Sequence, residues 1–136
     1  MSREIKFRGK RLDNGEWIYG YLVGASDSLG EKRYITKGPV YQATEVDPET
    51  VGQFTGLKDK NSVGVYEGDI VKNSYVSPLD NEEKSHIWVV EYETGMYWLR
   101  HIDKLKHYDS SLFLKFTRIE VVGNVHENPE LLEGKK

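Results

Sequence analysis

Short runs of alternating apolar and polar residues occur throughout this chain, and turn-forming residues end each run before a long helix could form. The clearest run is His86 to Glu93, in which Trp88, Val90 and Tyr92 fall on one face of an extended segment. A period of two is typical of half-buried β-strands. The sequence therefore predicts a mostly β fold without long helices.

Two pairs of runs are joined by short turn signals and predict antiparallel hairpins. The first pair joins a strand at 4–8 to a strand at 16–23 through Asp13-Asn14-Gly15, and the second joins 86–93 to 96–100 through Thr94-Gly95. The alternation also predicts which side chains are buried. We expect the core to contain Trp17, Tyr19, Ile70, Trp88, Val90, Tyr92 and Val121.

Two segments predict short helical turns, near 47–50 and near 128–132. In each, a residue that favours the N-cap precedes a proline at the first helical position, as in Asp47-Pro48 and Asn128-Pro129. Gly68 is expected to adopt a positive φ, and Asp69 to hydrogen-bond the local backbone. The residues expected to shape turns are Asp47, Pro48, Gly52, Gly56, Gly68 and Asp69.

Many short strands and turns predict a small β-barrel or roll, similar in style to SH3-like barrels. The 136 residues fit a single domain over 1–136, with the barrel part at about 51–126. The segment at 76–85 contains a Ser-Pro step and several acids, and we expect it to be a mobile loop. The tail at 134–136 is expected to fray.

Composition favours the cytoplasm. The chain has no cysteine, which excludes disulfides and thiolate metal sites and suits a reducing compartment. Its first residues lack the apolar stretch of a signal peptide, and no apolar run approaches the roughly 20 residues that span a bilayer. A membrane partner is therefore not expected.

The sequence presents no catalytic motif. Glu91 and Glu93 lie two residues apart on one predicted strand face, which suits a carboxylate pair but is also the pattern of a solvated face. The four histidines have no recognised metal spacing, and neither a nucleophile elbow nor a Gly-rich phosphate loop is present. We expect no enzyme, cofactor or metal, and a hydrolase-type enzyme is the least favoured alternative.

One basic run is a candidate contact surface for nucleic acid or a partner. It contains Arg100, Lys104, Lys106 and His107 and lies beside Trp98. Small barrels bind single strands by stacking bases on exposed aromatic rings next to a basic groove. The alternative is a solvated loop beside core tryptophans, and a net charge of −3 lacks the basic excess typical of duplex binding.

Two separated motifs resemble the YopX family of small phage and prophage proteins. The first runs from Val46 to Val71, and the second, Ile-Glu-Val-Val-Gly-Asn-Val-His-Glu-Asn-Pro-Glu-Leu, runs from Ile119 to Leu131. The family pattern has a glycine after Asn61 and an aromatic residue at the place of His126, so the chain departs from it at Ser62 and His126. The resemblance implies phage or prophage origin, a mostly β fold and no assigned catalytic or binding residues.

These observations favour a binding or adaptor module for a host or phage protein, acting in the cytoplasm of a bacterial host cell. Nine tyrosines and a near-neutral charge suit a protein interface, and exposed edge strands allow strand addition or homo-oligomers. The alternative function is single-stranded nucleic-acid binding by a small barrel.

Overall fold

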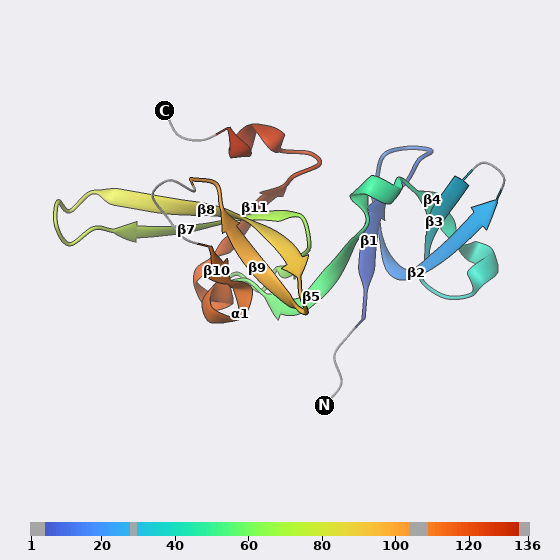
Figure 1. Cartoon of the computed structure of the whole chain (residues 1–136), viewed down its shortest axis with the longest axis horizontal. Coiled ribbons are helices and arrows are strands. Elements are labelled where there is room, and N and C mark those ends of the chain that lie inside the picture. Colours follow the sequence, from blue (N-terminus) through green and yellow to red (C-terminus); the bar gives the residue numbers. More distant parts are fainter. Residues whose placement is uncertain (1–4, 28–29, 104–108, 134–136) are drawn as a thin grey trace. The chain divides into compact units, whose positions relative to one another are not determined.

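The structure, a computed structural model, describes residues 5–27, 30–103 and 109–133. The tail at 134–136, which was predicted to fray, lies outside these ranges. The chain divides into two compact units, residues 1–56 and residues 57–136 (Figure 1). Antiparallel strands dominate both units, so the mostly β prediction is confirmed. The prediction of one domain over 1–136 stays a prediction.

The elements follow one another along the chain as β1 (Phe7–Lys10), β2 (Trp17–Asp27), β3 (Gly30–Thr36), η1 (Val40–Gln42), β4 (Thr44–Val46), η2 (Pro48–Thr50), β5 (Gly52–Lys58), β6 (Gly64–Tyr66), β7 (Asp69–Val76), β8 (Glu83–Glu93), β9 (Met96–His101), β10 (Ser110–Ser111), α1 (Leu112–Lys115), η3 (Phe116–Arg118), β11 (Glu120–Asn124) and η4 (Pro129–Leu132). The η elements are single 3₁₀ turns.

The first unit is built on antiparallel strands in the order β4-β3-β2-β1-β5, and β5 continues past the boundary between the units. β1 and β2 form the predicted hairpin, with Gly15 at φ 74° in its turn. A single bridge between Arg11 and Val46 also brings β4 back toward the end of β1. The described residues thus form two antiparallel sheets and no closed barrel, which corrects the predicted barrel.

The fully buried side chains of the first unit come from β3 and β4 and not from β2. Ile35 and Val46 are fully buried, and a Cβ placed on Gly9 would lie 3.0 Å from Val46, so the interior is already full beside β1. Trp17 is half-buried and Tyr19 is 39% exposed on the outer face. The prediction that Tyr19 belongs to the core is therefore wrong.

The second unit is a five-stranded antiparallel sheet in the order β10-β9-β8-β7-β11. Its predicted β8–β9 hairpin is confirmed, because Thr94 and Gly95 both adopt the positive φ (54° and 86°) that a two-residue hairpin turn of this kind requires. The buried cluster of this unit comprises Val65, Val71, Trp88, Val90, Leu99, Leu112 and Ile119.

The core predictions hold for most residues of the second unit. Ile70, Trp88 and Val90 are buried, and Val121 packs against the cluster. Tyr92 is 53% exposed, so its prediction is wrong. It lies near the turn end of the hairpin, where its ring packs edge-on against Tyr97 instead of entering the cluster.

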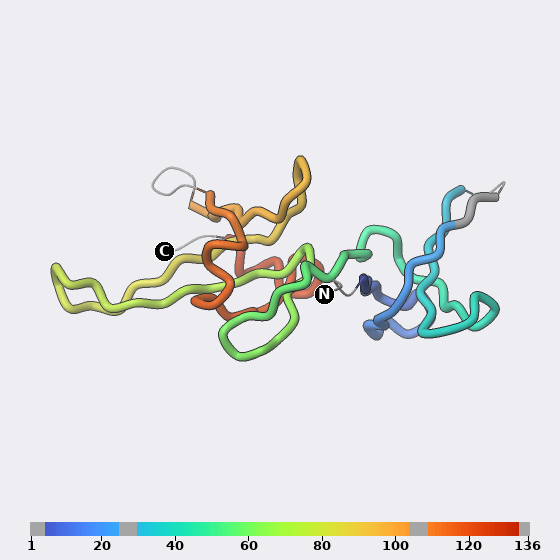
Figure 2. Tube along the Cα trace, turned by 90° about the horizontal axis from the view of Figure 1, so that it is seen from below, coloured from blue at the N-terminus to red at the C-terminus, as the bar shows by residue number. Residues whose placement is uncertain are grey.

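The segment at 76–85 contains the turn of the β7–β8 hairpin, and paired strand flanks it on both sides. β7 and β8 remain in register from Ile70 opposite Val89 to Val76 opposite Glu83, so the connecting turn is confined to 77–82. In Figure 2 this hairpin forms a long arm. The turn lies inside the segment predicted to be a loop, and the mobility of that segment stays a prediction.

Both predicted helical turns are present. Asp47 Oδ1 accepts the Glu49 N–H at 3.1 Å and caps the turn that begins at Pro48, as predicted. The turn at Pro129–Leu132 also forms, but the Asn128 side chain does not cap it. Gly52 and Gly56 lie within β5 and not in a turn.

Candidate functional site

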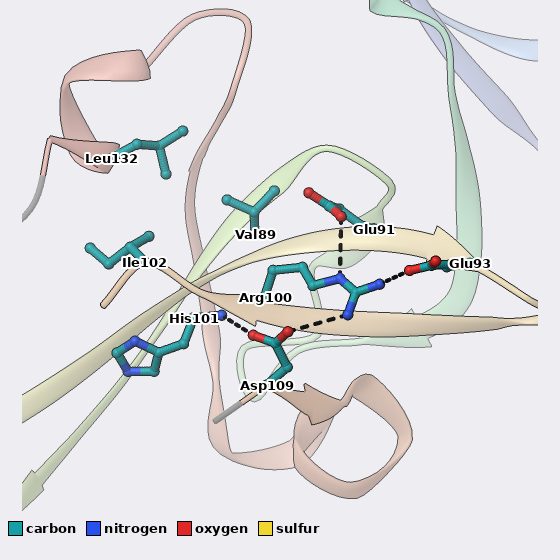
Figure 3. A pocket seen from close by; sticks show the side chains of 8 residues that line it. All are labelled: Val89, Glu91, Glu93, Arg100, His101, Ile102, Asp109 and Leu132. Carbon is teal, nitrogen blue, oxygen red and sulfur yellow. Dashed lines mark hydrogen bonds and ion pairs between the residues drawn. The ribbon is translucent and has the colours of Figure 1, made fainter. Parts of the chain in front are cut away.

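Arg100 on β9 binds three carboxylates. Its Nε donates to Glu91 Oε1 at 3.3 Å and its Nη1 to Asp109 Oδ2 at 3.2 Å, and its Nη2 pairs with Glu93 (Figure 3). Asp109 also accepts the backbone N–H of His101 at 2.9 Å, which anchors it to the same strand. Arg100 is therefore held in place by β8, by its own strand and by the segment before β10.

Electrostatics keep this guanidinium charged. Desolvation lowers the pKa of Arg100, but the hydrogen bonds that Arg100 donates to Asp109 and Glu91 outweigh it, and the net shift of the pKa is upward. The ring of Trp98 lies 5.3 Å from the guanidinium carbon and adds a cation–π contact.

A hollow of about 590 Å³ lies beside this cluster. Its described lining is Val89, Glu91, Glu93, Arg100, His101, Ile102, Asp109 and Leu132 (Figure 3). Three carboxylates outnumber the one guanidinium among these side chains. A hollow of this composition favours a cationic group over a phosphate.

The structure describes only one of the four predicted contact residues. Arg100 is described, whereas Lys104, Lys106 and His107 lie outside the described residues. Because Arg100 binds three acids, it is less suited to hold a phosphate than the sequence suggested. The role of the other three in nucleic-acid or partner binding stays a prediction.

Glu91 and Glu93, the acidic pair considered for catalysis, form ion pairs with Arg100. Glu91 and Glu93 lie on one face of β8, as the alternation predicted, and both contact Arg100. Their side chains remain 55% and 64% exposed. Within residues 5–27, 30–103 and 109–133, no three potential metal-ligating side chains come together.

Two histidines on neighbouring strands are joined side chain to side chain. His86 Nδ1 lies 2.9 Å from His101 Nε2. His101 Nδ1 accepts the backbone N–H of Asp103 at 2.9 Å, so the ring proton of neutral His101 is on Nε2 and is donated to His86. The His86 ring also stacks on Tyr75 at 5.5 Å between centroids. The pair is a structural link between β8 and β9.

The β7–β8 hairpin carries exposed apolar side chains that sequence reasoning did not single out. Leu79 is 95% exposed, Val76 61% and Tyr75 40%. The sequence does place apolar residues around a Ser-Pro turn. Because the segment was expected to be a surface loop, exposed apolar side chains there did not indicate a binding site.

Comparison with known proteins identifies the family. Residues 6–133 match the sequence model described as YopX protein. The chain belongs to the YopX family. The segments Val46–Val71 and Ile119–Leu131, on which the resemblance was based, both lie inside this match.

Relatives with solved structures have the same overall fold as this YopX-family chain. Protein EF1440 from Enterococcus faecalis is 26% identical, with a TM-score of 0.56 over 97% of this chain and 100% of that one. YopX from Bacillus subtilis is 23% identical, with a TM-score of 0.55 over 96% and 98%.

A curated relative is described as an SPbeta prophage-derived uncharacterized protein, YopX of Bacillus subtilis strain 168. It is 32% identical over 74 residues, which make up 53% of this chain and 52% of the relative. The matched region thus covers about half the length of this curated relative.

The YopX motif residues hold the fold together. Asp59 is 5% exposed, and its carboxylate accepts the N–H groups of Asn61 at 2.8 Å, Val63 at 2.9 Å and Val121 at 2.8 Å. Asp69, only 1% exposed, accepts the Tyr66 N–H at 2.8 Å. These side chains satisfy backbone donors at turns, so these two motif residues have a structural role in the fold.

The C-terminal YopX motif works in the same way. Asn124 Oδ1 accepts the N–H groups of His126 and Glu127, both at 3.0 Å. Asn128 Oδ1 accepts the Asn124 N–H at 3.1 Å, and a Cβ on Gly123 would meet that oxygen at 2.5 Å. Only glycine fits at position 123 with Asn128 in this place.

No described helix has the length and apolar character of a membrane span.

Proposed function

We propose that this YopX-family chain is a binding or adaptor module that recognises a protein, encoded by a phage or by its bacterial host, in the host cytoplasm. The phage context rests on the prophage origin printed for the curated relative. A second copy of the chain is one partner of this kind. We propose no catalytic activity.

The observation that supports the proposal best is the tip of the β7–β8 hairpin, residues 77–82, which we call the arm tip. Leu79 at its apex is 95% exposed and Val76 at its base is 61% exposed. Exposed leucines are common singly, but the turn that contains Leu79 lies at the end of a projecting hairpin (Figure 2), where a side chain is accessible to other molecules.

Local hydrogen bonds hold the arm tip in one conformation. Ser77 is 6% exposed, and its backbone N–H donates to Glu82 O at 2.9 Å while its carbonyl accepts the Asn81 N–H at 2.8 Å. The Ser77 hydroxyl also accepts the Leu79 N–H at 3.3 Å. These hydrogen bonds restrain the backbone on both sides of Leu79, which lowers the conformational entropy lost when a partner binds it.

Charge at the arm tip favours a protein over a nucleic acid. Asp80, Glu82 and Glu83 outnumber Lys84, which lies 3.2 Å from Asp80 and 3.9 Å from Glu82. This excess of carboxylates repels phosphates but suits a partner with an apolar pocket and basic side chains at its rim. We therefore expect Leu79 to enter an apolar pocket of a protein partner.

Affinity capture from bacterial lysate with and without nuclease tests the proposal. Immobilised wild-type chain should retain a defined protein after nuclease treatment, and the Leu79→Ser variant should lose it. Leu12→Ser is the matched control, since Leu12 is also exposed (57%) but lies in the first unit. Capture that nuclease abolishes, or that Leu79→Ser leaves unchanged, would contradict the proposal.

A further inference from the structure

An aromatic ladder lies on the outer face of β2 in the first unit. Trp17, Tyr19 and Tyr21 alternate along the strand, and Tyr19 and Tyr21 are 39% and 60% exposed. Side chains at i and i+2 of a strand lie about 6.8 Å apart on one face. The intervening Gly20 faces the interior, since its Cβ would meet the side chain of Ile35.

Cationic side chains of β1 lie beside this ladder. The antiparallel register places Arg8 opposite Tyr19 and Lys10 opposite Trp17. The Arg8 guanidinium carbon is 4.8 Å from the Trp17 ring centroid and Lys10 Nζ is 6.0 Å from it. Cation–π contacts of this kind keep positive charge next to the aromatic surface.

A hollow of about 410 Å³ lies beside β2 in the first unit and is lined from both faces of that strand. Trp17 and Tyr19 line it from the ladder and Ile18 from the other face, and the rest of the lining is Arg11, Glu16, Ile35, Thr36, Lys37 and Gln42. Arg11 is bound to Asp13 at 2.8 Å, and Lys37 is exposed at the rim. Aromatic surface, positive charge and an amide therefore surround one space.

We propose that this face binds single-stranded nucleic acid, with bases stacked on Tyr19, Tyr21 and Trp17 and phosphates held by Lys10 and Lys37. Neighbouring rings of the ladder are about 6.8 Å apart, about twice the 3.4 Å rise between stacked bases. Successive bases bound to the ladder therefore do not stack on each other, and each base stacks on an aromatic ring instead. A proline-rich peptide also fits aromatic ridges, but it has no phosphates for the cations.

This inference goes beyond the proposed protein-binding function. It concerns another unit, another ligand class and residues that the arm tip does not use. It also places nucleic-acid recognition away from the basic run at 100–107, whose described member Arg100 binds three carboxylates.

Fluorescence anisotropy with a labelled oligothymidylate of about 12 nucleotides tests the ladder, since small β domains cover about 4–16 nucleotides. Wild-type chain should bind at low salt. Tyr19→Ala/Tyr21→Ala should lower the affinity at least about tenfold, because each stacking platform is lost. Tyr19→Phe/Tyr21→Phe should retain the affinity, since phenylalanine keeps the ring.

Two further variants complete the test. Tyr92→Ala removes a tyrosine that is 53% exposed in the second unit, and it should leave binding unchanged. Lys37→Gln should reduce the slope of log affinity against log salt by about 0.7. Absence of oligothymidylate binding at low salt, binding of a proline-rich peptide in its place, or wild-type affinity in the double alanine variant would each overturn the proposal.

Discussion

Ser62 holds a backbone conformation that a glycine would adopt at lower cost. Its φ is 66°, in the left-handed region, within the turn that Asp59 organises. The YopX pattern places a glycine after Asn61, and the sequence left open what its displacement does to the turn. In this chain serine occupies the position after Asn61 and takes a left-handed φ there.

Ser62→Gly is expected to raise the free energy of unfolding by about 0.5–1 kcal/mol, because relief of left-handed strain exceeds the added entropy of the unfolded chain. Urea denaturation measures the change. Ser85→Gly, a control in the exposed part of β8, should lower stability instead, since a strand position gains nothing from glycine. Equal effects of the two substitutions would contradict the argument.

Trp88 combines a large buried ring with a buried donor. It is 3% exposed within the cluster of the second unit, and its Nε1 has no hydrogen-bond partner among the described residues. Trp88→Ala should lower the free energy of unfolding by about 3–5 kcal/mol through the cavity it creates. Trp88→Phe should cost clearly less, because it retains a ring and removes the unpaired N–H.

Thermal and urea denaturation of both Trp88 variants measure this difference. A Trp88→Ala variant as stable as the parent would show that the ring is not part of a packed core. If Trp88→Phe lowered the free energy of unfolding as much as Trp88→Ala, the volume of the ring would not be the main source of the stabilisation by Trp88.

The carboxylate of Asp80 makes two contacts at the tip of the β7–β8 arm. The Glu82 N–H donates to Asp80 Oδ1 at 3.1 Å, and Lys84 lies beside the same carboxylate. These two contacts, the backbone hydrogen bond first, lower the pKa of Asp80 below its ordinary value of 3.8. The stabilisation is complete above pH 3.8 and is lost as pH falls through the lowered pKa.

We therefore expect the Asp80 carboxyl to titrate with a midpoint below 3.8 in a carbon-13 NMR titration. The amide signals of Glu82 and Leu79 should shift with the same midpoint, and Asp80→Asn should abolish that step. A midpoint at or above the ordinary value would show that the turn does not select the ionised form.

The sequence predicted best those elements whose stabilising interactions involve residues only a few positions apart. Asp47-Pro48 and Thr94-Gly95 need only neighbouring backbone groups, and both turns form as expected. The buried face of β2 depends on Ile35 and Val46, which arrive from other strands, so alternation alone could not choose between the two faces.

The acids around Arg100 could have been found in part. The predicted β8–β9 hairpin fixes a register in which Arg100 lies diagonally beside Glu91, so that ion pair was accessible from the sequence. Asp109 follows a segment outside the described residues, and its contact with Arg100 needed the structure. The arm was missed because turn residues and exposed apolar residues both favour a loop.

At the scale of the molecule, the two units bury different amounts of apolar side chain. The first unit buries Ile35, Val46 and Phe54 among the described residues, whereas the cluster of the second unit has seven members. Stability against local opening follows the buried apolar surface. Amide protons of β2 and β3 should therefore exchange faster than those of β8 and β9 under native conditions.

Hydrogen exchange followed by mass spectrometry of peptides measures that difference directly. Equal protection of the two pairs of strands would show that the chain opens as one cooperative whole. The Trp88→Ala variant should raise exchange in β8 and β9 before it does so in β2 and β3.

The carboxylate of Asp59 accepts hydrogen bonds both from residues close to it in the sequence and from a residue far from it. Its bonds to Asn61 and Val63 span a few residues, whereas its bond to Val121 spans 62. A short loop closes at little entropic cost, and the long one closes only as the strands between assemble. In stopped-flow experiments, Asp59→Asn, which keeps one oxygen for the turn, should speed unfolding and leave the folding rate nearly unchanged. One side chain thus links a local turn to a strand that lies 62 residues further along the chain.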